Sequence, residues 1–331
     1  MTARPDRPDA APRRLLAQLD AGAAVSGSEL AARLGVSRAA VWKQVEQLRA
    51  AGLDIEAQAG NGYRLAAPLD LLDADAIRAA LTPATRQRLA DLDVAWQIDS
   101  TSSELLRRAA SGARDRSVCL AERQSAGRGR RGRAWQMPLG GGLALSMFRR
   151  FDGAMASLAG LSLVAGLAAV DALARCGVDG VGLKWPNDLV AREAKLGGIL
   201  VELGGDALGP CHAVIGVGIN LRLGAAAAAI DQRVVDIAAL APVPSRNTLA
   251  ARLVEALDDS IDTFVRDGFA AFAERYAYCD VLRGREVDVL RANGKERGIA
   301  RGVDARGALR VAFADGERSV DSGEVSVRAG A

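Results

Sequence analysis

Arginine and glycine alternate over residues 127–133 of this chain, in the run GRGRRGR. The glycines free the backbone to wrap, so that three or four guanidinium groups converge on one small volume. Such a cluster repels itself unless an anion lies among its members, and a guanidinium matches phosphate or carboxylate with two parallel hydrogen bonds. The run therefore predicts an anion-binding loop. A disordered or RNA-binding tract is the competing interpretation, which one short copy in an apolar context does not favour.

A second polar cluster, KWPND, occupies residues 184–188. Lys184 offers a cation for phosphate, Asn187 an amide with directional hydrogen bonds, and Asp188 a carboxylate ligand for Mg²⁺. Pro186 stiffens the turn that presents these groups. The pentapeptide alone predicts little, but together with the Arg-Gly run it is distinctive.

Two further segments, residues 195–203 and 213–220, are predicted strands with closely spaced glycines. A strand glycine lets the backbone approach a ligand closely, but it also marks β-bulges, so both interpretations of Gly216 and Gly218 remain open. His212 is the only histidine and has no evident partner for acid–base chemistry, so we expect a structural role.

The elements that position these groups belong to a chain of 331 residues, which is enough for two or three domains. The formal net charge of +3, from 43 basic and 40 acidic residues, excludes a dedicated nucleic-acid binder, so any DNA contact must be a local patch. Four scattered cysteines argue against zinc and against a disulfide framework, and they fit a reduced cytoplasm. The N-terminus lacks the apolar core of a signal peptide.

An uncharged stretch at residues 153–170 sits at the lower length limit for a membrane span. It is rich in small residues, and Leu158, Leu161, Ala165 and Ala168 share one helical stripe. We therefore predict a helix packed in a globular core and no membrane partner.

The first 67 residues have the pattern of a winged helix-turn-helix domain. A short helix is expected at residues 13–19, a second one is capped by Ser28 and ended by Gly35, and a third one is capped by Ser37. A hairpin follows around residues 60–62.

In such a domain the helix after the turn enters the major groove with its N-terminal residues toward the bases. The residues predicted to contact DNA are Ser28, Ser37, Arg38, Trp42, Lys43 and Arg64. A three-helix packing module without a DNA partner is the interpretation left open.

Residues 68–280 mix strands with helices, including an amphipathic helix at 249–265, and predict a central α/β domain. From residue 281 to 331 the chain has only short alternating strands, at 286–290, 297–303, 308–316 and 324–329, with turns at Asn293-Gly294 and Asp315-Gly316. This predicts a small barrel-like β domain docked on its neighbour.

The Arg-Gly run and KWPND together resemble the motifs of the biotin-protein ligases, and the resemblance covers nearly the whole chain. It implies an α/β multidomain protein: a winged helix-turn-helix head, a mixed α/β catalytic domain of the class II synthetase-like type related to lipoate ligases, and a small SH3-like C-terminal β-barrel. The family's two-function members have these parts in this order.

The resemblance also implies the site residues. Those assigned to biotin are Ser100, Thr101, Ser102, Gln124, Arg128, Gly129, Arg130, Lys195, Gly216 and Gly218. Those assigned to the nucleotide are Trp135, Lys184, Asn187, Asp188 and Asn220, with Asp188 also as the Mg²⁺ ligand. The catalytic cations implied are Arg128, Arg130, Lys184 and Lys195.

Hydroxyl and amide groups suit the ureido ring of biotin, and the indole of Trp135 suits a purine, although Trp135 is also an ordinary core residue. The family commonly reads Ser-Thr-Asn where this chain has Ser102 as the third residue, which puts that ligand contact in question. Capping of the following helix remains an alternative role for Ser102 and Ser103.

The reaction implied consumes ATP and biotin with Mg²⁺, forms biotinyl-5′-AMP, and transfers biotin to a lysine of the biotin carboxyl carrier protein of acetyl-CoA carboxylase. The head implies an adenylate-dependent repressor that binds operator DNA as a ligand-induced homodimer. Two alternatives remain open: a lipoate or octanoate ligase on the same scaffold, and a ligand-sensing transcription regulator without catalysis.

Overall fold

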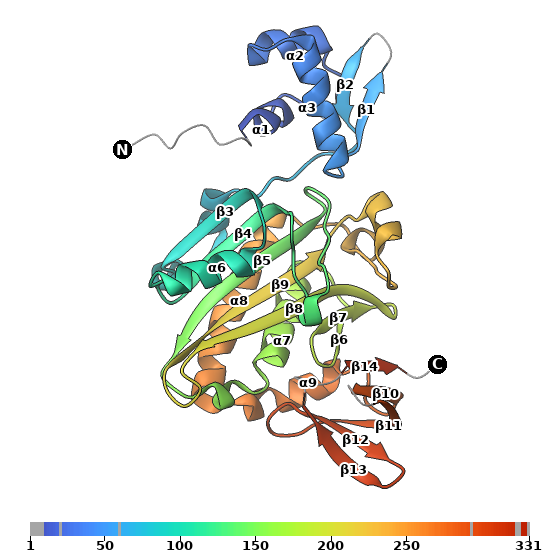
Figure 1. Ribbon diagram of the computed structural model, residues 1–331. Coiled ribbons are helices and arrows are strands. Elements are labelled where there is room, and N and C mark those ends of the chain that lie inside the picture. The colour runs from blue at the N-terminus through green and yellow to red at the C-terminus, as the bar shows by residue number, and fades with distance from the viewer. Residues whose placement is uncertain (1–9, 20–21, 59–60, 292–293, 322–325, 330–331) are drawn as a thin grey trace.

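The structure is a computed structural model, and it describes residues 10–19, 22–58, 61–291, 294–321 and 326–329 (Figure 1). Three parts follow one another along the chain: a helical head with a hairpin, a central sheet flanked by helices, and a small C-terminal sheet. The predicted boundaries after residues 67 and 280 fall between elements and remain a prediction.

The head consists of three helices and one antiparallel hairpin. Its elements are α1 (Ala10–Leu16), α2 (Gly27–Leu34), α3 (Arg38–Ala50), β1 (Ile55–Gln58) and β2 (Gly62–Leu65). The predicted stripe of Val41, Val45 and Leu48 on α3 is buried against Leu15 and Leu30. The winged helix-turn-helix order is therefore present.

One helix cap differs from the prediction. Ser37 caps α3 by accepting from the main-chain nitrogen of Ala40, and Gly35 ends α2 at a φ of 66°. Ser28, however, lies inside α2 and is exposed, because Ser26 is the cap and accepts from the main-chain nitrogen of Glu29. Ser26 and Glu29 have the spacing of a capping box, a signal in the sequence that identifies the earlier serine.

A seven-stranded sheet forms the central part, in the order β3-β4-β5-β9-β8-β7-β6. Only β3 and β4 pair in parallel, and the other neighbours are antiparallel. The strands are β3 (Asp91–Ile98), β4 (Ser117–Gln124), β5 (Gly142–Phe151), β6 (Gly182–Lys184), β7 (Asp188–Ala191), β8 (Ala194–Gly205) and β9 (Cys211–Asn220). The helices are α4 (Ala74–Ala80), α5 (Pro83–Arg88), α6 (Thr101–Ala110), α7 (Leu161–Arg175), α8 (Arg246–Asp267) and α9 (Ala273–Cys279).

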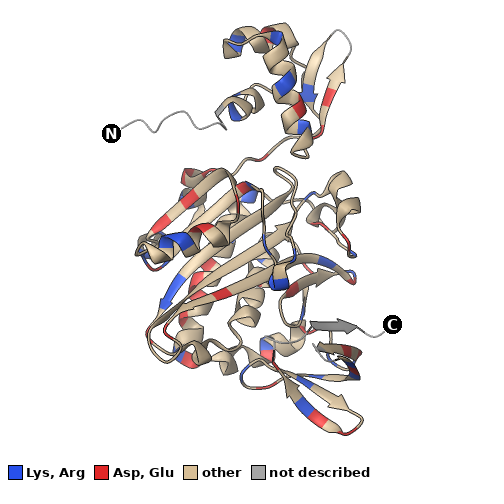
Figure 2. Ribbon diagram, viewed as in Figure 1, with Lys and Arg blue, Asp and Glu red and all other residues tan. Residues whose placement is uncertain are grey.

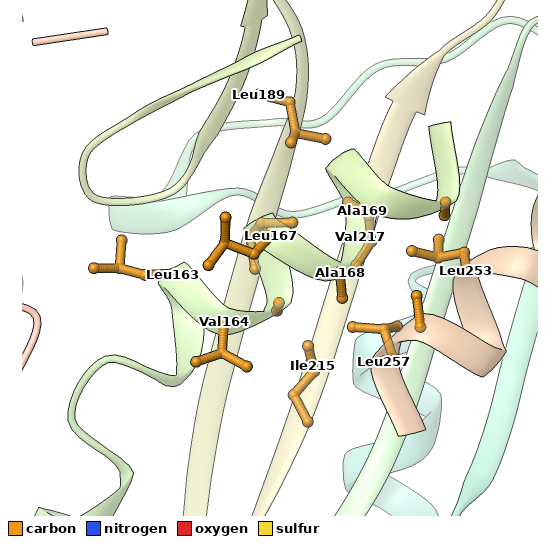
Figure 3. Close-up of a cluster of buried hydrophobic side chains, with 14 of the residues drawn as sticks. Leu163, Val164, Leu167, Ala168, Ala169, Leu189, Ile215, Val217, Leu253 and Leu257 are labelled. Atoms are coloured by element: carbon orange, nitrogen blue, oxygen red, sulfur yellow. The ribbon is translucent and has the colours of Figure 1, made fainter. Parts of the chain in front are cut away.

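Helices cover both faces of this sheet. Alternate strand residues point to opposite faces, so Cys119 packs toward Leu105 of α6 while its neighbour Leu120 packs on the other side. On that other side α7 and α8 pack against each other and both contact the sheet, with Leu167 and Leu253 in one apolar cluster (Figure 3).

By length and composition alone, Met155–Arg175 would pass for a membrane-crossing helix, yet most of it is buried within the protein. The predicted stripe of Leu158, Leu161, Ala165 and Ala168 is buried, with Leu158 in a short 3₁₀ helix (Met155–Leu158) before α7. The prediction of a packed core helix is confirmed by these contacts.

The C-terminal part is a five-stranded antiparallel sheet, in the order β13-β12-β11-β10-β14. Its strands are β10 (Glu286–Arg291), β11 (Gly294–Val303), β12 (Leu309–Phe313), β13 (Gly316–Val320) and β14 (Ser326–Ala329). The prediction missed β13, because four of its five residues are exposed and it lacks an apolar alternation. Asn293, in one of the two predicted turns, lies outside the described residues.

This sheet docks on the central part, as predicted. Its buried residues Val287 and Leu309 belong to the same apolar core as α7 and α8. The indole nitrogen of the buried Trp185 donates to the main-chain oxygen of Gly307 at 3.0 Å. The C-terminal sheet thus supports the segment that carries KWPND.

Candidate active site

The predicted site residues converge on one cavity of about 140 Å³ at the middle of the sheet. Every predicted biotin residue lines it, as do four of the five nucleotide residues: Ser100, Thr101, Ser102, Gln124, Arg128, Gly129, Arg130, Trp135, Lys184, Asn187, Asp188, Lys195, Gly216 and Gly218. The fifth, Asn220, lines an adjoining cavity of about 900 Å³. Trp135, Lys184, Asp188 and Lys195 line both, so the two cavities meet at these side chains.

Hydroxyl groups from α6 and β5 form one wall of the smaller cavity. Ser100 caps α6, accepting from the main-chain nitrogen of Ser103 at 3.4 Å, while Ser102 lines the cavity instead of capping. The Oγ atoms of Ser102 and Ser146 are 2.9 Å apart, and Ser146 Oγ lies 2.8 Å from Thr101 Oγ1. Sequence reasoning missed Ser146, because a serine inside an apolar strand gives no sign in the sequence of the residues that it contacts.

The two strand glycines are sites of close approach, because the pairing of β9 with both neighbours runs without a shift in register. A Cβ atom at Gly216 would lie 2.7 Å from Ser102 Oγ, and one at Gly218 would lie 2.5 Å from the indole of Trp135. The alternative of a β-bulge is therefore wrong at both positions, and the indole of Trp135 packs directly on the backbone of β9.

Lys195 stands at the junction of the two cavities. Its Nζ lies 2.8 Å from Asp188 Oδ1 and 5.9 Å from the ring centre of Trp135. The lysine side chain is only 17% exposed, which concentrates its charge on the cavity. Asn220 is buried and its amide nitrogen donates to the main-chain oxygens of Lys195 and Val235. Asn220 thus holds the strand that carries Lys195, and its contact with adenine stays a prediction.

The Arg-Gly run folds back on itself over this cavity. The main-chain nitrogen of Gly129 donates to the main-chain oxygen of Arg133 at 2.7 Å. The main-chain nitrogen of Trp135 donates to the main-chain oxygen of Gly127 at 2.8 Å. Burial and the neighbouring charge of Arg131 lower the pKa of the Arg130 guanidinium. Crowded cations of this kind favour an anionic ligand.

Two partners of the loop were not predicted from the sequence. Arg128 forms an ion pair with Glu202 of β8 at 2.6 Å, and Arg130 Nη1 lies 3.3 Å from the side-chain oxygen of Asn187. Asn187 in turn donates to the main-chain oxygen of Ile199 at 2.9 Å. The loop is therefore tied to KWPND and to β8 through side chains.

His212 packs its ring 5.3 Å from that of Phe148, and burial, with Arg150 as a second cause, lowers its pKa. This supports the structural role that we expected. Within the described residues, no three or more His, Cys, Asp or Glu side chains are grouped to hold a metal ion.

The chain between the Arg-Gly run and β5 reaches into the head. Leu139 is buried among the apolar residues of the head, and its main-chain nitrogen donates to the oxygen of Ala51 at 2.9 Å. A Cβ atom at Gly52 would lie 2.6 Å from Pro138. We call residues 136–141 the strap, since they connect Trp135 of the cavity to the C-terminal end of α3.

A buried ion pair fixes the linker that leads out of the head. Arg246, at the start of α8, lies 2.8 Å from both Glu122 Oε2 and the main-chain oxygen of Asp70, and the main-chain nitrogen of Leu72 donates to Glu122. Both charged side chains are 3% exposed. The linker is therefore held to the central part by hydrogen bonds.

On the head, ion pairs distinguish the predicted DNA-contacting residues. Arg64 pairs with Glu56 at 2.6 Å, so it is already neutralised. Arg38, Trp42 and Lys43 are exposed on the first turns of α3, and the Trp42 side chain is 58% exposed. Figure 2 shows basic residues on these helices in a head that also carries acidic ones. The exposed basic residues Arg38 and Lys43 thus lie on α3, and their contact with DNA stays a prediction.

Three family models match the chain in the order of its parts. They are an HTH domain over residues 13–64, the biotin/lipoate A/B protein ligase family over residues 94–220, and the biotin protein ligase C terminal domain over residues 283–328. The middle match includes the Arg-Gly run, KWPND and β9.

Similar proteins agree with these matches. The bifunctional ligase/repressor BirA of Salmonella typhimurium and that of Escherichia coli are each 38% identical, over 96% of this chain and 97% of their own length. The biotin protein ligase of Aquifex aeolicus, solved with biotin and ATP, superposes with a TM-score of 0.64 at 27% identity, over 73% of this chain and 100% of that one. The chain belongs to the BirA family of biotin protein ligases with a DNA-binding HTH domain.

Proposed function

We propose that this protein activates biotin with ATP as biotinyl-5′-AMP and transfers it to a lysine of the biotin carboxyl carrier protein of acetyl-CoA carboxylase. The observation that carries this proposal is the junction of two cavities at Lys184, Asp188 and Lys195. One cavity has the hydroxyl wall suited to a ureido ring, and the other has room for a nucleotide beside Trp135. The carboxylate and the α-phosphate would meet between the lysines.

In the first step an oxygen of the biotin carboxylate attacks the α-phosphorus, the bond to the bridging oxygen breaks, and pyrophosphate leaves. Two anions must approach each other, so the side chains of Lys184, Lys195 and Arg130 lower the barrier by offsetting their repulsion. In the second step the acceptor amine attacks the biotinyl carbonyl carbon, AMP leaves, and the nitrogen loses a proton as the amide forms. Neither step needs a nucleophile from the protein.

The proposal includes Mg²⁺, which would bind together with ATP. Asp188 is the carboxylate that lines both cavities, and it is already paired with Lys195. Mg²⁺ sites in such enzymes take one or two carboxylates together with substrate phosphates, so the donor set fits a phosphate-bound ion. The ion would offset charge on the leaving pyrophosphate.

Mass spectrometry of a purified carrier domain tests the ligase proposal directly. Incubation with this protein, ATP, Mg²⁺ and biotin should add one biotinyl group, and omission of ATP should abolish the addition. A thermal-shift comparison of biotin with lipoate separates the proposal from a lipoate or octanoate ligase. Pyrophosphate release with biotin and ATP separates it from a regulator without catalysis.

We propose further that the head binds operator DNA through α3 and represses transcription when the adenylate is present. Arg38 and Lys43 flank Trp42 on the face that a winged helix presents to the major groove. In gel shifts with the DNA upstream of its own gene, Lys43→Ala should weaken binding. Arg33→Ala is the matched control, because Arg33 is paired with Glu29 on α2. Equal loss in both variants would argue against α3 as the reading helix.

A ligand-induced homodimer is the proposed link between adenylate and repression. Ordering of the Arg-Gly loop would complete a surface that pairs two protomers and spaces two heads for a palindromic site. Analytical ultracentrifugation with and without biotin and ATP measures this. By linkage, DNA must tighten adenylate binding by the same factor. We place the protein in the cytoplasm, where its four free cysteines would stay reduced.

A further inference from the structure

The hydroxyl wall contains a chain of hydrogen bonds whose direction is fixed at one end. The main-chain nitrogen of Thr101 lies 2.8 Å from Gln124 Oε1. A main-chain N–H donates and never accepts, so this contact identifies the atom of Gln124 as its oxygen. The side-chain hydroxyl of Thr101 lies 3.2 Å from the same oxygen and therefore donates to it.

The direction then passes along the wall. A hydroxyl carries one hydrogen, and Thr101 uses its own on Gln124, so it accepts from Ser146 at 2.8 Å. Ser146 has thereby used its hydrogen, and it accepts from Ser102 at 2.9 Å. The Ser102 hydroxyl therefore presents only its lone pairs to the cavity that it lines.

We infer that Ser146 is a specificity-determining positioning residue, which makes Ser102 an acceptor that selects a ligand with an N–H donor. This rests on the proposed placement of the biotin ureido ring in the smaller cavity. Ser146 is fully buried on β5, and its neighbours Thr101 and Ser102 are 3% and 4% exposed. Because these hydroxyls are shielded from solvent, reversing the direction of their hydrogen bonds would be costly.

The chemistry of the ligand follows from this polarity. A cyclic urea offers two N–H donors beside its carbonyl, whereas the dithiolane of lipoate and the chain of octanoate offer none. A ligand without a donor leaves a buried lone pair unpaired on Ser102, which costs binding. The wall therefore recognises biotin and disfavours acyl substrates that related ligases accept.

An oxazolidinone analogue of biotin, with one ureido N–H replaced by a ring oxygen, probes this polarity with little change of size. Both isomers would be compared with biotin by kcat/KM for pyrophosphate release from the full-length protein. We expect the protein to disfavour one isomer by about 30-fold, the scale of an unpaired buried polar group. In Ser146→Ala the Ser102 hydroxyl turns freely, so that ratio should shrink about fivefold or more.

Two further variants separate polarity from packing. Thr101→Ser keeps every hydroxyl of the chain and should keep the wild-type ratio. Ser117→Ala removes another buried serine of the same sheet, whose hydroxyl donates to the main-chain oxygen of Arg114, and should also keep the wild-type ratio. A purely structural effect of Ser146→Ala would lower activity on biotin and on the analogue alike.

The result that overturns the inference is a ratio in Ser146→Ala within about twofold of wild type, or equal use of biotin and both isomers by the wild type. A wrong placement of the biotin ureido ring would give a different result. If Ser102→Ala leaves kcat/KM for biotin unchanged, the ureido ring does not lie at this wall, and the proposed biotin site itself is wrong.

Discussion

Replacement of Lys195 by alanine tests the junction of the two cavities. Lys195 Nζ is 2.8 Å from Asp188, and its side chain is 17% exposed. Because it is mostly shielded from water, the loss of its charge-assisted hydrogen bond to an anion should cost about 1.5–3 kcal/mol. At about 1.4 kcal/mol per tenfold, kcat/KM for pyrophosphate release should fall about 10- to 150-fold.

The fold should survive this change. Asp188 is 26% exposed, so water can hydrate its carboxylate once Lys195 is removed, and no fully buried charge is left unpaired. A thermal unfolding midpoint close to that of the wild type would show that the lost activity is not lost structure.

Lys295→Ala is the matched control. Its Nζ lies 2.7 Å from Asp288 in the C-terminal sheet, so the variant removes a lysine–aspartate pair outside the cavity. Pyrophosphate release should be unchanged. If Lys195→Ala also stays within about twofold of wild type, the assignment of Lys195 to the reacting anions is wrong.

Three other predictions concern the loop, β9 and the lone histidine. Arg130→Gly should loosen the loop while the other cations still hold the phosphate, so the adenylate should escape from the site. Bystander proteins should then become biotinylated on their lysines. If their labelling is as low as with the wild type, the loop does not cover the adenylate. Gly218→Ala should displace the indole of Trp135, shift its fluorescence and cost about 1–3 kcal/mol of stability, and an unchanged spectrum counts against this packing. Burial lowers the pKa of His212, so the unfolded chain takes up the proton first and stability falls as the pH drops below about 6.5. His212→Gln should flatten that part of the thermal-shift profile, and an unaltered slope would assign it to other groups.

The site could be predicted from motifs because its chemical groups lie close together in the sequence, in short runs. The Arg-Gly loop and KWPND each place several groups by local sequence, and their juxtaposition in the fold follows from the family. Ser37 was found as a cap for the same reason, since capping depends on three neighbouring residues. Where local signals competed, as between Ser26 and Ser28, the serine three residues before Glu29 is the cap and accepts from the main-chain nitrogen of Glu29.

Residues that act across strands were beyond such reasoning. Ser146 meets Thr101 and Ser102 of α6 over separations of 45 and 44 residues, and Glu202 meets Arg128 over a separation of 74 residues. Nothing near either residue in the sequence marks it as a partner. The same holds for Leu139, whose apolar side chain would suit any strand end.

The strap has a consequence for anyone who wishes to use this enzyme as a labelling reagent. A chain cut after residue 67 would present Leu139 and the neighbouring Leu69 to water, because the head that covers them would be gone. Their exposure adds an apolar surface on which truncated molecules can associate, and it frees the segment beside Trp135. Shortening the protein therefore calls for a polar replacement at Leu139 in the same design, chosen for solubility as much as for rate.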